Sequence, residues 1–84
     1  MDGSATIKDL ELSTTETFLR ELAALPEYNV DAIVSLIMRR QSDLKRLSAT
    51  ARWEHEMNLI AAYLRKNISG LYLDIVRTNT GLPI

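Results

Sequence analysis

The amino-acid sequence predicts an all-α fold, namely a three-helix domain built on a long antiparallel helical hairpin. Apolar residues recur every three or four positions from Val30 to Leu47 and again from Trp53 to Ile75, which is the spacing of one face of an α-helix. The two apolar stripes are out of phase, so we expect a break near residues 48–50. A chain of 84 residues has room for one domain, spanning residues 1–84.

The first helix is predicted over residues 13–25. Ser13 is a good N-cap residue, and Glu16 stands three positions later, as in a capping box. Pro26 ends the helix, because a proline disfavours helical geometry in the residue before it. Residues 1–12 precede this helix and are expected to form a partly flexible acidic arm.

The second helix is predicted over residues 30–47. Asn29 can cap its first turn, and Asp31 places a negative charge near the positive end of the helix dipole. The short connection that begins at Pro26 requires a sharp reversal between the first two helices. The second helix is therefore expected to run antiparallel to the first.

The third helix is predicted over residues 51–77, with a length of about 42 Å against about 27 Å for the second helix. Its far end would therefore lack an intramolecular partner, which predicts self-association as a homodimer. Because Leu71, Leu73 and Ile75 alternate with other residues after Gly70, a strand at this end is the alternative.

Charge is divided unevenly along a chain whose net charge is −1. Residues 1–31 carry two basic and seven acidic side chains, whereas residues 32–84 carry eight basic and four acidic ones. Basic residues of the second half could form an anion-binding ridge at one end of the hairpin, and a nucleic-acid-binding protein is the alternative function that this ridge suggests. The predicted ridge consists of Arg39, Arg40, Lys45, Arg46 and Arg52.

No pattern of catalytic or cofactor-binding residues occurs in the sequence. The single histidine, His55, lies between two glutamates that cannot share its helical face, and no cysteine is present. The three glycines, Gly3, Gly70 and Gly81, are scattered and make no phosphate-binding loop. We therefore expect a protein without catalytic residues, metal or cofactor.

The leading functional hypothesis is a small non-enzymatic adaptor or regulator that binds a protein partner through an apolar helical surface. The first residues do not resemble an export signal, and the longest apolar stretch, residues 32–38, is too short to span a bilayer. A cytoplasmic location is expected, without membrane contact. Residues predicted to contact the partner are Trp53, Leu71, Tyr72 and Ile75.

Overall fold

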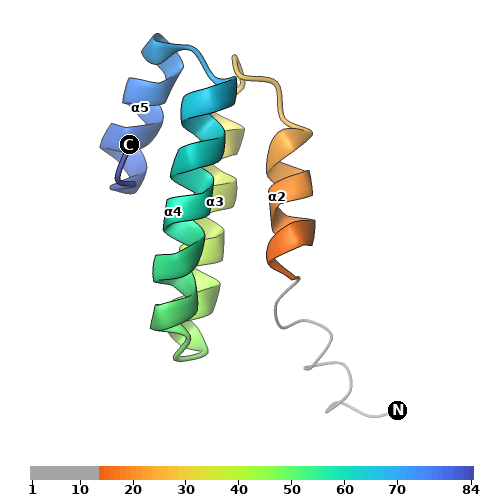
Figure 1. The fold of residues 1–84 in the computed structure, drawn as a ribbon, viewed down its shortest axis with the longest axis vertical. Helices are drawn as coiled ribbons and strands as arrows, with labels where there is room; N and C mark the ends of the chain where they lie inside the picture. The colour runs from red at the N-terminus through yellow and green to blue at the C-terminus, as the bar shows by residue number, and fades with distance from the viewer. Residues whose placement is uncertain (1–13) are drawn as a thin grey trace.

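Four α-helices follow one another along residues 14–84, the part of the chain that the computed structural model describes. Each helix runs in the opposite direction to the one before it (Figure 1). No strand occurs in this part of the chain, so the all-α class is confirmed and the alternative strand after Gly70 is not formed. The helices are α2 (Thr15–Ala23), α3 (Val30–Arg46), α4 (Thr50–Asn67) and α5 (Gly70–Thr80).

Helix α2 is capped by Thr14. The Thr14 hydroxyl accepts a hydrogen bond from the backbone N–H of Thr17 at 3.1 Å, which satisfies one of the amide groups that the first helical turn leaves without a partner. The expected cap Ser13 and the acidic arm of residues 1–12 lie outside the described residues. Phe18 and Leu22, one turn apart, are the buried side chains of this helix.

Helix α3 begins and ends with distinct capping arrangements. The Asn29 side chain accepts a hydrogen bond from the backbone N–H of Ala32 at 3.4 Å, which confirms the predicted N-cap. At the other end Ser48 has φ 58°, in the left-handed region, and its N–H donates to the Lys45 carbonyl at 3.0 Å. The next N–H, of Ala49, donates to the carbonyl five residues earlier at 2.8 Å. This pair of bonds is the Schellman motif, and it turns the chain sharply into α4.

The single long helix expected over residues 51–77 is instead two helices. Helix α4 ends at Asn67, and Ile68 and Ser69 are extended, with ψ values of 138° and 157°. Gly70, which would cost roughly 1 kcal/mol inside a helix, stands at the first position of α5. The break lets the chain fold back along α3 and α4, whereas a straight continuation would carry its apolar residues past the end of α3.

The core lies where α3, α4 and α5 contact one another, with α2 packed along α3 (Figure 1). Helix α5 contributes Val76, which is fully buried, and the tail that follows contributes Leu82. Trp53 has only 3% of its surface exposed and therefore belongs to this core. The ten residues of the main apolar cluster are Phe18, Leu22, Ile33, Ile37, Leu44, Trp53, Ile60, Leu64, Val76 and Leu82.

Candidate functional site

The fold divides the five basic residues predicted to form an anion-binding ridge into two groups, one at a buried carboxylate and one on the surface. Arg40 points into the molecule and has 5% of its surface exposed. Arg39, Lys45 and Arg46 are exposed, and Arg52 is half-buried. The prediction was therefore wrong in placing Arg40 on a surface ridge, because α2 covers the side of α3 from which this side chain projects.

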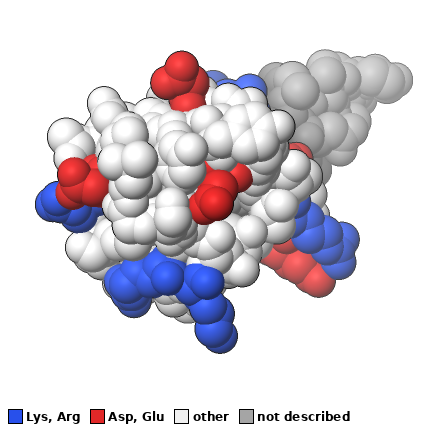
Figure 2. All heavy atoms as spheres, turned by 90° about the horizontal axis from the view of Figure 1, so that it is seen from above, with Lys and Arg blue, Asp and Glu red and all other residues white. Residues whose placement is uncertain are grey.

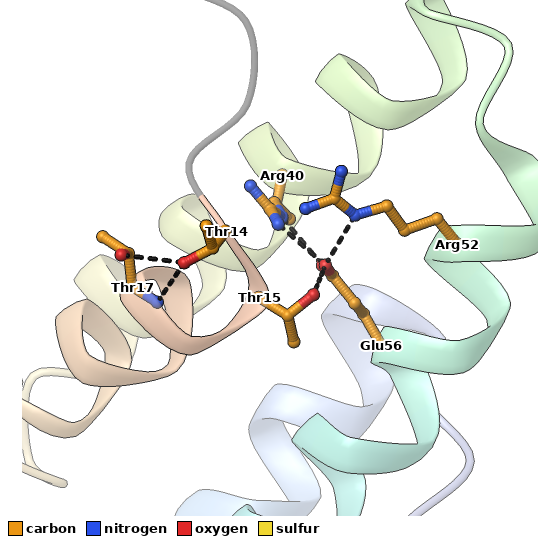
Figure 3. Close-up of polar contacts among 6 residues, drawn as sticks. All are labelled: Thr14, Thr15, Thr17, Arg40, Arg52 and Glu56. Atoms are coloured by element: carbon orange, nitrogen blue, oxygen red, sulfur yellow. Dashed lines mark hydrogen bonds and ion pairs between the residues drawn. The ribbon is translucent and has the colours of Figure 1, made fainter.

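Arg40 belongs to a buried charged cluster to which α2, α3 and α4 each contribute (Figure 3). Its Nε donates to Glu56 Oε1 at 2.7 Å and its Nη2 to Glu56 Oε2 at 2.7 Å, which makes a two-pronged guanidinium–carboxylate pair. The Thr15 hydroxyl donates to Glu56 Oε2 at 2.5 Å, and Arg52 Nε approaches the same oxygen at 3.4 Å. The carboxylate is thus held from three directions.

The cluster also fixes α2 against the rest of the molecule. The guanidinium carbon of Arg40 lies 5.0 Å from the centre of the Phe18 ring, a cation–π arrangement. A recognisable signal for the buried Glu56 exists in the sequence, since Trp53, Glu56 and Ile60 are spaced by three and four and so share one helical face. The hydropathy pattern overlooked Glu56 because it counts only apolar residues.

The pKa of Glu56 lies below its ordinary value of 4.5. Burial alone would raise the pKa, but the hydrogen bonds from Arg40 and Thr15 and the positive charges of Arg40 and Arg52 outweigh it. A carboxylate held ionised in this way is a poor proton acceptor. All buried side-chain polar atoms in residues 14–84 have hydrogen-bond partners. The cluster therefore acts chemically as an internal ion pair that orients three helices.

The remaining members of the predicted ridge offer little concentrated charge. Arg46 forms an ion pair with Asp43 one turn earlier on α3, at 3.1 Å. Arg39 and Lys45 have no ion-pair partner among the described residues. They are separated by six positions in α3, which points their side chains in different directions. The structure therefore brings Arg40 and Arg52 together at Glu56 and leaves Arg39, Lys45 and Arg46 on the exposed surface of α3.

The residues predicted to bind a partner also divide into two groups. Trp53 is buried and is removed from this set. Leu71 and Ile75, one turn apart on α5, have 71% and 40% of their surface exposed. Tyr72 is half-buried beside them. We call Leu71, Tyr72 and Ile75 the α5 face.

A further exposed aromatic residue lies at the same end of the molecule. Tyr28, in the connection between α2 and α3, is 73% exposed. Its neighbour Glu27 accepts a hydrogen bond from the backbone N–H of Ser69 at 2.9 Å, which ties this connection to the start of α5. Figure 2 views this end and shows a largely uncharged surface with acidic side chains on it and basic side chains near its edge. Sequence reasoning missed Tyr28, although an aromatic residue in a short polar connection is a usable signal.

The described residues contain no group of three or more His, Cys, Asp or Glu side chains that could hold a metal ion. His55 is exposed on α4. Within residues 14–84, no helix combines the length and the apolar character needed to cross a membrane.

No protein-family model matches the chain, and no curated protein or solved structure is significantly similar to it.

Proposed function

We propose that this chain is a small non-enzymatic adaptor or regulator that binds a protein partner on the α5 face. The observation that carries the proposal is the exposure of Leu71, an apolar residue that is 71% exposed in a helix whose other side is packed in the core. Removing such a side chain from water on binding would contribute about 2 kcal/mol. Binding to a partner buries the Leu71 side chain.

The composition around Leu71 favours a protein as the partner. Tyr72 and Tyr28 present apolar rings with hydroxyl tips, and tyrosine is enriched in protein interfaces because it can bury its ring while its hydroxyl hydrogen-bonds. At this end of the molecule uncharged atoms predominate, with acidic and basic side chains interspersed among them (Figure 2). Such a surface complements an apolar patch better than it complements phosphate groups. The nucleic-acid alternative is less well supported, because Arg40 is neutralised by Glu56 inside the molecule.

The test immobilises three proteins and compares which partner proteins each of them retains. The three are the full chain, the double variant Leu71→Glu/Ile75→Glu, and the control Leu59→Glu. Leu59 is also an exposed apolar residue, at 37%, but lies on α4. We expect a protein to be retained by the full chain and the control and lost from the double variant. Its retention should persist as salt is raised, since apolar burial is not screened whereas phosphate binding weakens steeply. Equal capture by all three proteins would reject the proposal.

A further inference from the structure

A groove of about 420 Å³ runs between α2 and α3, on a different side of the molecule from the α5 face. Half-buried apolar side chains contribute to its surface, and polar side chains from both helices complete it. A volume of this size accommodates several side chains. The residues that line the groove are Glu21, Leu25, Ala32, Ser35, Leu36 and Arg39.

The groove carries one charged residue on each wall, an acid on α2 and a base on α3. Helices α2 and α3 run antiparallel (Figure 1), so Leu25 and Ala32, the lining residues nearest to the connection between the helices, lie at one end. Glu21 on α2 and Arg39 on α3 lie further from the connection, on opposite walls. The acid and the base thus stand on opposite walls of the groove, and Leu36 lies between Ala32 and Arg39 along α3.

Both charged residues are without an ion-pair partner among residues 14–84. Each is exposed, and no carboxylate lies within ion-pair distance of Arg39, nor any basic group within that distance of Glu21. Leu25, Ala32 and Leu36 remain half-buried. An occupant of this groove would have to supply apolar surface, a positive charge for Glu21 on one wall and a negative charge for Arg39 on the other.

We propose that a second copy of the same chain is this occupant. A twofold interface joins one surface patch to itself, so the patch must be complementary to its own rotated image. A twofold axis along the groove, parallel to the helices, places the wall of each copy that carries Glu21 over the wall of the other copy that carries Arg39. The same rotation places the apolar lining residues of the two grooves against each other.

The helices fit the same arrangement. In the dimer α2 of each copy packs on α3 of the other, and the two are antiparallel because the axis runs along the helices. Leu25 then meets the Ala32 and Leu36 region of the other copy, so that these half-buried side chains lose contact with water. A chain of 84 residues gains from such burial, because small domains bury a modest fraction of their surface alone.

The test measures the dimer dissociation constant of the full chain by sedimentation equilibrium. Glu21→Arg alone places four positive charges at the interface, and Arg39→Glu alone places four negative ones. Each single variant should dimerise at least about tenfold more weakly than the unchanged chain, with a smaller difference at high salt. The double variant Glu21→Arg/Arg39→Glu exchanges both charges and should recover the original dissociation constant.

Mixing the two single variants provides a second readout. Glu21→Arg and Arg39→Glu copies are complementary to each other, so their mixture should form a heterodimer under conditions in which each alone is monomeric. Glu54→Arg and Lys66→Glu, which reverse exposed charges on α4, are the controls and should leave dimerisation unchanged. A monomeric unchanged chain, single variants with unaltered dimerisation, or a double variant without recovery would each overturn the proposal.

Discussion

At the scale of single residues, the pairing of Arg40 with Glu56 is the most consequential interaction in the described part of the chain. Both side chains are almost fully buried, and their two hydrogen bonds are each 2.7 Å long. Removing one partner of a buried ion pair leaves the other charge without compensation, which commonly costs 3–5 kcal/mol. The pair therefore makes the packing of α2, α3 and α4 depend on both residues at once.

We predict that stability falls in acid because of Glu56. The pKa of Glu56 is below 4.5 in the folded chain and returns to that ordinary value on unfolding. As the pH falls through this value, the unfolded chain takes up a proton while folded Glu56 stays ionised, so protonation favours the unfolded state. The free energy of unfolding, measured with urea at a series of pH values, should fall until the pH passes the folded pKa.

Substitution isolates the contribution of Glu56. Glu56→Gln should lower the free energy of unfolding by about 3 kcal/mol at neutral pH and flatten its dependence on pH below 4.5. The control Glu54→Gln changes an exposed glutamate on the same helix and should have little effect on either quantity. If both variants showed the same pH dependence as the unchanged chain, Glu56 would not be the group responsible.

At the scale of elements, the connections between helices decide the topology. The turn between α3 and α4 requires a left-handed residue, and Ser48 occupies that position with φ 58°. A residue with a Cβ atom pays roughly 1–2 kcal/mol in this conformation, whereas glycine does not. At the end of α5 the corresponding residue is already a glycine, Gly81, with φ 74°.

We predict that Ser48→Gly stabilises the protein. The relief of the left-handed strain is partly offset by the greater freedom of glycine in the unfolded chain, so the free energy of unfolding should rise by about 0.5–1 kcal/mol. Ser42→Gly is the matched control, because Ser42 is an exposed serine inside α3, where replacing serine by glycine should cost about 0.5 kcal/mol. Urea denaturation of both variants checks the prediction. Destabilisation by both substitutions would contradict the left-handed geometry at Ser48.

At the scale of the whole molecule, the reversal between α4 and α5 determines which apolar residues are buried. Helix α5 presents Val76 to the core and leaves Leu71 on the surface. A straight helix over residues 51–77 would instead have continued the stripe of α4 through Leu71 and Ile75. Leu71 is therefore a surface residue in the observed fold, whereas it would belong to the apolar stripe of a straight helix.

We predict a large difference between two alanine substitutions in α5. Val76→Ala should lower the free energy of unfolding by about 2 kcal/mol, because it leaves a cavity in a close-packed core. Leu71→Ala should change it by less than about 0.5 kcal/mol, because its side chain is 71% exposed. Urea denaturation of monomeric samples measures both. The reverse order of effects would indicate a continuous third helix.

Local patterns in the sequence were sufficient to predict the helical class, the Asn29 cap and the start of α3 at Val30. These features depend on residues close together in the chain: an apolar repeat every three or four positions and a side-chain oxygen that satisfies a nearby amide. The approximate position of the turn near Ser48 followed from the change of phase between two stripes. Such signals can be interpreted without knowledge of how the helices pack.

The inward direction of Arg40, the reversal at Ser69 and the exposure of Leu71 were settled by contacts between residues distant in sequence. Arg40 is buried because Glu56, sixteen positions away, offers it a carboxylate. The chain reverses at Ser69, and this reversal lets Val76 reach the core. A hydropathy value depends only on the residue type. It therefore cannot predict that a charge is neutralised by a distant partner, or that an apolar stripe is interrupted because the interruption gives a better core. For that reason the charged ridge predicted from the sequence is divided by the fold, because Arg40 turns inward to Glu56. Leu71 and Ile75, which the sequence also suggested as contact residues, are exposed on α5.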